Sequence, residues 1–580
     1  MAHFHIKKKK GRPYLYVREI ARVDGKPKVV NQVYIGSPEK VAAMASGGFG
    51  EDLELKVEEF GALWLARLMD QDIDLAGIVD DVVPRGRTET GPTVGEFFLY
   101  AVLNRMVEAV SKNQLARWYG RTAIQQIRPV AVDQLTSERY WQKWERVTEA
   151  DLQQISRRFF ARLWTVEQPE SDCLLFDTTN YYTFMSGGTE SDLAVRGHNK
   201  AGRSHLRQVG LALLVARECR LPLYWQAYPG NLHDSKLFSS LMQEIFGITC
   251  GRGRTKQRLT VVVDKGMNSE ENFLWLDEHP QIHFVTTYSP RYVEELMAVP
   301  LADYLPVEIP RNRALAAAGH PEEQMLAWRT RGEFWGKERA VVITWNPPTA
   351  RKKQLVLEQK LDRVRQELLV MRAKVRTGEP QWRDPEVIWE RYFRLCEQLH
   401  LGSDLYDLEF AEEPEGLAMG FRKDAYRVSR TEQRFGKTVI VTDNVDWSTA
   451  EIATASLDRW QVEDRFRQSK DHDLVGVQPV RHGTDGKIRC HMFSCVVALA
   501  YLRRLELRLS EAGVSRSAAD VMDDMKHLHS VLMVPAGARK PRRRLEKPSK
   551  TQAEVLSALR WRVDGGGVLQ ESGKQRYLLL

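Results

Sequence analysis

The sequence predicts an α/β fold in which a mixed sheet with helices follows a small β module and a helical segment. Three observations predict it: polar and apolar residues alternate near the N-terminus, apolar residues take helical spacing from about residue 51, and short apolar runs begin after residue 171. The 580 residues include 85 Lys and Arg against 77 Asp and Glu, a formal net charge of +8, and 43% are apolar. This composition is that of a globular protein and excludes a disordered or collagen-like chain.

The N-terminal segment 1–50 is predicted to be the β module. Tyr14 and Tyr16 alternate with polar residues before the turn Asp24-Gly25-Lys26, and the alternation resumes after it, as in a β-hairpin. The basic cluster Lys7 to Lys10 is not followed by an apolar stretch, so no secretory signal peptide is expected. Since the apolar runs of the chain are also too short to cross a bilayer, we expect a cytoplasmic protein.

Residues 51–165 are predicted to form a helical domain that binds DNA. The segment Ser111 to Gly120 resembles a short recognition helix, because Lys112 and Arg117 stand among Asn and Gln side chains that can contact bases and phosphates. A helix face exposed to solvent explains the same residues equally well. Lys112 and Arg117 are therefore candidate DNA contacts.

After a polar break, residues 166–289 switch to strand patterns. A helix from about Ser235 to Phe246 separates the third and fourth strands, so the order is three strands, a helix, a strand, a helix and a strand. This order predicts a mixed sheet with helices. The predicted strands cover Cys173–Phe176, Val209–Ala216, Leu221–Ala227, Leu259–Val263 and Ile282–Thr286.

Residues 290–443 are predicted to form a β-rich insertion that contains a helical hairpin. Strand patterns at Ala340–Trp345 and Thr438–Val441 enclose the hairpin. In its first arm, apolar residues alternate at spacings of four and three, which is the seam of a coiled coil. A structural role within the chain is the simplest explanation of this seam, and pairing with another copy is the alternative. The seam consists of Leu357, Leu361, Val364, Leu368, Met371 and Val375.

The sheet domain is predicted to resume over residues 444–535 with strongly helical sequence. Residues 536–580 are predicted to be a mobile basic tail, because Arg539 to Arg544 contains five positive charges and one proline.

Two predicted strands end in an aspartate, Asp177 after Phe176 and Asp264 after Val263. Side chains that follow buried strands of an α/β sheet project into the usual ligand crevice. Either residue taken alone is explained as well by a helix cap or a turn. A further acidic residue from elsewhere in the chain would favour a catalytic site.

That residue is Glu463, on a helix predicted to begin at the capping box Ser448 to Glu451. At about 100° per residue, Arg459, Glu463 and Lys470 share one face of this helix. An exposed stripe of charge pairs is the alternative. Close packing of the helix against another part of the chain is indicated, by contrast, by Trp460, Val462 and Phe466.

These residues resemble the bacterial insertion-sequence transposases of the DDE type, whose signature is Tyr-x2-Arg-x3-Glu-x6-Lys. Arg459, Glu463 and Lys470 stand at the required intervals, and Ser456 replaces the tyrosine. Asp177 within Phe-Asp-Thr-Thr and Asp264 before Lys-Gly match the other two acids of the family. The long separation between the second acid and the glutamate resembles members that carry a β-rich insertion in the catalytic domain.

The resemblance implies a ribonuclease-H-like core interrupted by the insertion. Asp177, Asp264 and Glu463 are then the catalytic residues and the metal ligands, and three carboxylates suffice for two ions of Mg²⁺ or Mn²⁺ per active site. Water would nick the end of the element, and the freed 3′-OH would then attack target DNA. Arg459 and Lys470 would contact phosphates beside the cleaved bond.

The resemblance also implies the partners. These are double-stranded DNA, as terminal inverted repeats and target, and a second copy of the chain in a synaptic complex, with no membrane involved. Arg203 and Arg207, before the second predicted strand, are further candidate DNA contacts. Two alternatives remain: a two-metal nuclease that cuts without joining, and a domesticated DNA-binding protein.

Overall fold

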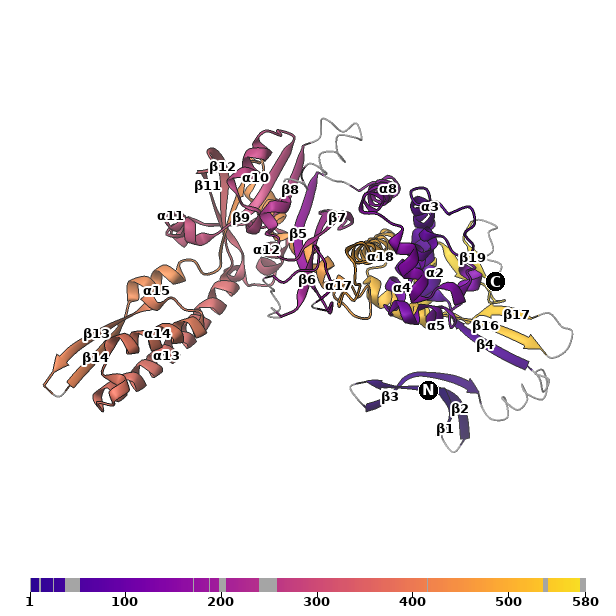
Figure 1. Ribbon diagram of the computed structural model, residues 1–580, viewed down its shortest axis with the longest axis horizontal. Coiled ribbons are helices and arrows are strands. Elements are labelled where there is room, and N and C mark those ends of the chain that lie inside the picture. The colour runs from indigo at the N-terminus through magenta and orange to yellow at the C-terminus, as the bar shows by residue number, and fades with distance from the viewer. Residues whose placement is uncertain are drawn as a thin grey trace. The chain divides into compact units, whose positions relative to one another are not determined.

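The structure is a computed structural model, and the chain divides into two compact units (Figure 1). The first unit comprises residues 1–167, 469–477 and 486–580, and the second comprises residues 168–468 and 478–485. None of the helices in the described part of the chain is long and apolar enough to cross a membrane. The structure describes residues 2–9, 12–23, 26–36, 53–169, 172–186, 188–197, 205–238, 242, 258–414, 416–535 and 541–573.

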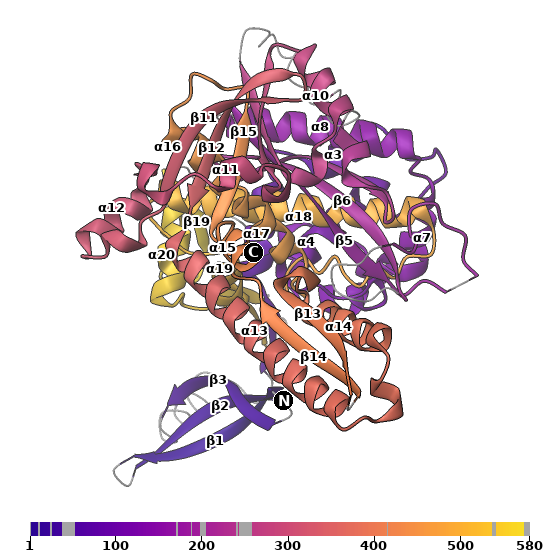
Figure 2. The ribbon, with the colours of Figure 1, turned by 90° about the vertical axis from the view of Figure 1, so that its left-hand side faces the viewer.

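The first unit begins with a three-stranded antiparallel sheet in the order β1-β2-β3 (Figure 2). The predicted hairpin is present as β2 (Arg12–Val23) and β3 (Lys26–Gly36). The sheet has one strand more than expected, β1 (Ala2–Lys9). The C-terminal half of β1 belongs to the lysine cluster. Consecutive lysines interrupt the alternation of polar and apolar residues by which a strand is recognised in a sequence.

Helices form most of the rest of the first unit. The long C-terminal helix α18 (Asp485–Glu511) is buried over most of its length, because its residues are apolar on several faces. Phe493 of α18 packs edge-on against Phe98 of α4 and Phe159 of α8, so sequence-distant helices share one aromatic core. Further α-helices of this unit are α2 (Gly61–Asp70), α3 (Leu75–Asp80), α4 (Val94–Val107), α5 (Leu115–Tyr119), α6 (Ile124–Ile127), α7 (Ser137–Glu145), α8 (Glu149–Glu167) and α19 (Ala518–Lys526).

The basic C-terminal segment is folded where the structure describes it, in contrast to the expected mobile tail. Strand β17 (Arg542–Leu545) pairs with β16 (His529–Pro535), which pairs in turn with β4 (Leu53–Glu59). Arg543 forms an ion pair with the buried Glu58 of β4. Part of the charge run is therefore used to neutralise a buried acid. Helix α20 (Lys550–Ala558) and strands β18 (Trp561–Val563) and β19 (Leu569–Glu571) follow.

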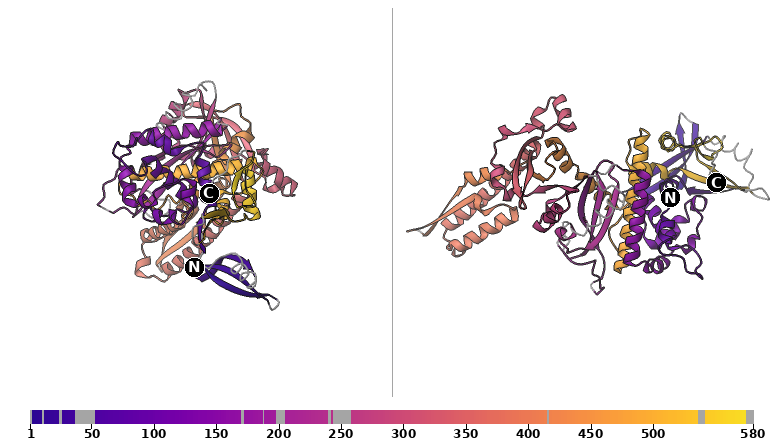
Figure 3. Two further views of the ribbon diagram at one scale, coloured as in Figure 1. Left: turned by 90° about the vertical axis from the view of Figure 1, so that its right-hand side faces the viewer. Right: turned by 90° about the horizontal axis from the view of Figure 1, so that it is seen from above.

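The second unit is built on a mixed sheet, and Figure 3 gives two further views of the ribbon. The sheet has nine strands in the order β10-β11-β12-β15-β9-β8-β5-β6-β7. Only the pairs β5–β8 and β8–β9 are parallel. All five strands predicted before residue 289 are present, and they are adjacent in the order β7-β6-β5-β8-β9. Their bounds are β5 (Cys173–Thr183), β6 (Arg207–Ala216), β7 (Pro222–Pro229), β8 (Leu259–Val263) and β9 (Ile282–Tyr288). Of the segment expected as a helix at 235–246, the described residues are those of the short turn Asp234–Leu237, together with Phe238 and Met242.

Helices cover both faces of this sheet. Val285 packs in one cluster with Ile452 of α16 (Thr449–Leu457), whereas the neighbouring Phe284 contacts Phe273 of α10 (Glu270–Asp277) at a ring distance of 4.6 Å. Successive residues of a strand point to opposite faces, so α16 and α10 lie on opposite sides of the sheet. A sheet buried on both faces explains the continuous apolar runs of β8 and β9.

The strands of the segment expected as an insertion extend this same sheet. Strands β10 (Leu305–Pro306), β11 (Leu326–Phe334), β12 (Lys337–Trp345) and β15 (Lys437–Thr442) continue it beyond β9. The short helices α11 (Glu294–Met297) and α12 (Pro310–Ala317) connect the first of them.

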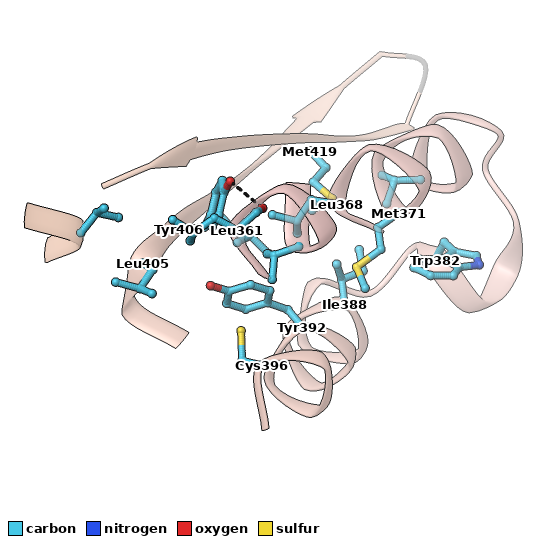
Figure 4. Close-up of a cluster of buried hydrophobic side chains, with 14 of the residues drawn as sticks. Leu361, Leu368, Met371, Trp382, Ile388, Tyr392, Cys396, Leu405, Tyr406 and Met419 are labelled. Atoms are coloured by element: carbon cyan, nitrogen blue, oxygen red, sulfur yellow. Dashed lines mark hydrogen bonds between the residues drawn. The ribbon is translucent and has the colours of Figure 1, made fainter. Parts of the chain in front are cut away.

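Between β12 and β15 the chain forms a separate arm with its own core (Figure 4). The arm consists of α13 (Pro347–Arg376), α14 (Pro385–Leu399), the hairpin of β13 (Tyr406–Glu413) and β14 (Gly416–Lys423), and α15 (Ala425–Glu432). All six residues of the predicted heptad seam are buried in this core. Tyr392 and Cys396 of α14 face them, and the Tyr406 hydroxyl donates a hydrogen bond to the Leu361 carbonyl oxygen. The seam is thus closed within the arm.

Candidate active site

The sequence predicted that Asp177 follows the end of a strand. In the structure, Asp177 lies inside strand β5. The strand continues because β6 pairs with it beyond this point, from Asp177 opposite Leu213 to Thr183 opposite Arg207. On its other side, β5 pairs with β8 only as far as Leu175. Asp177 therefore lies where one neighbouring strand has already ended.

Asp264 lies level with Asp177 in the sheet. Leu175 pairs with Val262 in parallel register, and each aspartate follows its paired residue by two positions. Residues at matching positions of parallel neighbours point to the same face. The strand register therefore brings the two carboxylates to one face, at the end of β8.

Glu463 comes from a second helix, because the single predicted helix is broken. The predicted capping box is present at the start of α16, where Ser448 and Glu451 cap each other. Helix α16 then ends at Leu457, and α17 (Trp460–Ser469) begins after Asp458 and Arg459. Asp458 accepts a hydrogen bond of 2.7 Å from Arg217, which fixes the break to the turn after β6.

Helix α17 buries one side and exposes Glu463 on the other. Val462 and Phe466 are buried, whereas the Glu463 side chain retains 60% of its exposure. Trp460 is only half-buried, and the Arg220 guanidinium lies 4.7 Å from the centre of its ring. Close packing of this helix thus rests on Val462 and Phe466 more than on Trp460.

The guanidinium of Arg459 contacts all three carboxylates. Its Nη1 donates a hydrogen bond of 3.0 Å to Oδ1 of Asp264, and its Nη2 lies 3.7 Å from Oε1 of Glu463 and 4.0 Å from Oδ2 of Asp177. The Arg459 side chain is itself mostly buried. The three acids that the sequence singled out therefore gather around one cation.

The carboxyl group of Asp177 is electrostatically perturbed. Burial raises the pKa of Asp177 to about 6, and the negative charges of Asp264 and Glu463 add to this increase. Arg459 and the backbone N–H of Thr178, which donates to Oδ1 at 2.8 Å, act in the opposite direction. Three carboxylates around one guanidinium leave an excess of negative charge in the group.

This charge and the donor chemistry fit divalent metal ions. Carboxylate oxygens are the ligands that Mg²⁺ and Mn²⁺ prefer, and an excess of negative charge favours a cation. As the side chains stand, no three acidic, His or Cys residues in the described part of the chain are grouped closely enough to ligate one ion. A metal at Asp177, Asp264 and Glu463 therefore requires the Arg459 side chain to withdraw.

Thr287 is a site residue that sequence reasoning missed. Its hydroxyl donates to Oδ1 of Asp264 at 3.3 Å. The Thr287 carbonyl oxygen accepts a hydrogen bond from Asn268, whose side-chain oxygen also accepts one from Thr286. The only signal in the sequence is a pair of threonines after the apolar run of β9, which is too common to identify a site. Thr287 positions the Asp264 carboxylate.

The other basic residues predicted to contact DNA are dispersed over several segments of the chain. Lys470 follows the last residue of α17, in a segment that belongs to the first unit. Arg207 of β6 donates to the carbonyl oxygen of Thr189 at 2.6 Å, so it holds a loop of its own unit. Arg203 lies outside the described residues.

The predicted recognition helix is short, and Lys112 does not lie on an exposed face. Lys112 is buried, with its Nζ 4.9 Å from the ring centre of Tyr140 and 5.0 Å from that of Trp144. Burial lowers the pKa of its amine. The expectation that Lys112 contacts DNA is therefore corrected, because the aromatic rings of α7 cover it. Arg117 of α5 is exposed.

Comparison with known proteins gives one family match. The family described as Transposase DDE domain matches residues 169–502, more than half of the chain and a range that includes all three carboxylates. No curated protein matches the sequence. Among solved structures, a cryo-EM structure of a piggyBac transposase synaptic complex with hairpin DNA has 9% sequence identity and a TM-score of 0.37, covering 80% of this chain and 78% of that one.

Proposed function

The chain belongs to the transposases with a DDE domain, and on this premise we propose that it cuts and joins DNA strands at the ends of a bacterial insertion sequence. The observation that carries the proposal is the convergence of Asp177, Asp264 and Glu463 on one guanidinium, from two strands and a helix far apart in sequence. Surface acids and helix caps have no reason to converge in this way.

In this proposal, Asp177, Asp264 and Glu463 are the catalytic residues and hold two divalent ions, Mg²⁺ or Mn²⁺. When bound, such ions stabilise the attacking and leaving oxygens of a phosphodiester. Asp177 lies within β5 and Asp264 directly follows β8, whereas Glu463 is exposed in the first turn of α17. Two aspartates held by the sheet and a glutamate exposed to solvent suit a site that binds a large substrate such as DNA.

The proposed chemistry has two steps. In the first, a water oxygen forms a bond to the phosphorus at the end of the element, the bond to the 3′-oxygen breaks, and that oxygen leaves as a 3′-OH. In the second, the freed 3′-oxygen forms a bond to a phosphorus of target DNA and the target's own 3′-oxygen leaves with a proton. Phosphodiester bonds are conserved in the second step, so no energy-rich cofactor is needed.

Arg459 has a second role in this proposal. A guanidinium binds phosphate as well as carboxylate, since its planar donors match both groups. When DNA enters, Arg459 leaves the carboxylates and contacts a phosphate beside the cleaved bond. Lys470 is proposed to contact a phosphate beside the cleaved bond as well, and Arg207, Arg203 and Arg117 are proposed as further DNA contacts.

A ribonuclease-H-like core is part of the proposal. It is supported by the adjacency β7-β6-β5-β8-β9, in which β5, β8 and β9 are parallel, β6 and β7 continue the sheet in antiparallel pairing, and helices cover both faces. We also propose that residues 51–165 bind DNA, that the segment 290–443 is an insertion in the catalytic domain, and that two copies of the chain act together on DNA in the bacterial cytoplasm.

The proposal is tested with a plasmid that carries the gene and its own flanking DNA. In Mg²⁺, the purified chain should release the element's ends and join them to a second plasmid, and EDTA should abolish both reactions. Cleavage without joining would identify a nuclease instead. Sequence-specific binding with neither reaction would identify a DNA-binding protein without catalytic activity.

A further inference from the structure

Helix α13 of the arm has two different apolar faces. The first face is the buried seam that packs against α14 and the β13–β14 hairpin. A residue two positions away along a helix is rotated by about 200°, so Gln366 lies on the opposite side from Leu368 and Gln359 on the opposite side from Leu361. The side of α13 that carries Gln359 and Gln366 is called the outer face below.

The outer face repeats every seven residues. Along this face, one residue at each of positions 352, 359, 366 and 373 points straight outward. Midway between two such positions, two adjacent residues share the face, so the face presents a contact position every 3.5 residues on average. This is the period of a coiled-coil seam. The single residues are Lys352, Gln359, Gln366 and Ala373, and the pairs are Leu355-Val356, Asp362-Arg363 and Leu369-Val370.

The apolar pairs of this face are open to solvent. Leu355 is 56% exposed, Val356 42% and Val370 49%, whereas Leu369 is partly covered. A surface helix of a folded protein normally presents polar residues on the side away from its core. One exposed apolar residue needs no explanation, but two apolar pairs spaced by two heptads on one helix indicate a contact surface.

The centre of the outer face carries opposite charges next to each other. The side chains of Asp362 and Arg363 are both exposed. Asp362 and Arg363 lie about 100° apart, on the two flanks of the outer face. When two identical helices pair in parallel around a two-fold axis, each residue is level with its own copy and opposite flanks meet. Asp362 then faces the partner's Arg363, and Arg363 faces the partner's Asp362.

We propose that the outer face of α13 binds the same face of a second copy of this chain, as a parallel two-stranded coiled coil. The apolar pairs pack across the interface at both ends, Gln359 and Gln366 meet their own copies, and two reciprocal Asp362–Arg363 ion pairs fix the register. DNA is the weaker candidate for this surface, because exposed Leu and Val side chains and an acidic group at the centre do not suit a phosphate backbone. The inference rests only on the dimeric part of the proposed function and does not depend on DNA cleavage.

Charge exchange tests the interface without DNA. Sedimentation equilibrium of the full chain should show that Asp362→Arg or Arg363→Asp raises the dimer dissociation constant roughly tenfold or more, because like charges then face each other. The double variant Asp362→Arg/Arg363→Asp should restore the wild-type value. Unchanged association in the single variants, or no recovery in the double variant, would overturn the proposal.

Cysteine cross-linking tests the direction of pairing. With an oxidant, Gln366→Cys should give a disulfide-linked dimer of the full chain, since Gln366 lies level with its copy in a parallel pair. Glu397→Cys, exposed on α14, is the matched control and should stay monomeric. Cross-links found only in a mixture of Gln359→Cys and Gln366→Cys chains would show antiparallel pairing and overturn the parallel arrangement. Both experiments are read without DNA, so their failure is distinct from a failure to cleave or join.

Discussion

The side chains of Arg459 and Asp264 are joined by a hydrogen bond of 3.0 Å, across 195 positions of sequence. The same guanidinium also lies within 4.0 Å of Asp177 and Glu463. A positive charge thus occupies the group of carboxylates that we propose to hold metal. Because one cation disfavours another nearby, Arg459 and the metal ions compete for these acids.

Replacing Arg459 should therefore strengthen metal binding in the absence of DNA. Arg459→Gln removes the competing charge, and we expect the dissociation constant for Mn²⁺ to fall roughly tenfold or more. Electron paramagnetic resonance of free Mn²⁺ measures this directly. Activity on DNA should fall in the same variant, since the phosphate contact is lost.

Arg467→Gln is the matched control for this experiment. Arg467 is on the same helix, but it is highly exposed and pairs with Asp464. Its replacement should leave Mn²⁺ affinity unchanged. Weaker binding of Mn²⁺ by Arg459→Gln would mean that Arg459 supports the metal site and does not compete with the metal.

The pKa of Asp177 predicts a pH dependence of stability. Burial raises this pKa to about 6 from the ordinary value of 3.8, so the folded protein holds the proton more tightly than the unfolded chain does. The resulting stability is fully present below about pH 4 and is lost as the pH rises through about 6. The free energy of unfolding of Asp177→Asn should not fall in this way, because its side chain does not titrate. For wild type, the fall is at most about 3 kcal/mol, at 1.36 kcal/mol per unit of pKa difference.

Thermal unfolding in EDTA checks this prediction. The Tm of Asp177→Asn relative to wild type should rise between pH 4 and pH 7. Asp446→Asn is the control, since Asp446 is an exposed acid in a surface pair with Arg258. Parallel pH profiles for Asp177→Asn and wild type would contradict a raised pKa for Asp177.

The buried position of Lys112 predicts that it does not contribute to DNA binding. Lys112→Met replaces a buried amine by an apolar side chain of similar length, so we expect an equal or higher Tm. The salt dependence of DNA binding should not change. The exposed Arg117, if it contacts a phosphate as proposed, should behave differently: Arg117→Ala should reduce the slope of log K against log salt by about 1. An equal reduction in Lys112→Met would show that Lys112 reaches DNA.

The arm should depend on its buried seam. Leu368 is fully buried among the residues of α13 and α14, and Leu368→Ala should destabilise the arm by about 2–5 kcal/mol. Limited trypsin digestion of the full chain with mass spectrometry should show faster cleavage within residues 347–435. Glu367→Ala, exposed on the same helix and outside the outer face, is the control and should leave the cleavage rate nearly unchanged. Equal cleavage of both variants would contradict an independent core in the arm.

Local patterns identified much of the fold. The continuous apolar runs of β8 and β9 and the heptad spacing of α13 can be recognised from the sequence alone, because burial imposes a fixed period on each element. The capping box at Ser448 and Glu451 likewise marks the start of α16. The three acids were identified by matching spacing to a family and not by geometry.

The structure differs from the sequence-based predictions where residues distant in sequence determine the local structure. Strand β5 continues past Asp177 because β6 pairs with it, and that pairing is invisible in the strand's own sequence. The break before α17 follows a helix-compatible sequence and is fixed by Arg217. Lys112 is buried by rings that lie about 30 positions away in the sequence. Tertiary contacts outweigh local preference in each case.

The most direct test is strand transfer in Mg²⁺ with DNA that carries the element's own ends, comparing wild type with Glu463→Gln and with the control Asp446→Asn. We predict joined products for wild type and the control, and none for Glu463→Gln, while all three bind the ends equally. Joined products from Glu463→Gln at the wild-type rate would contradict the assignment of Glu463 to the catalytic site.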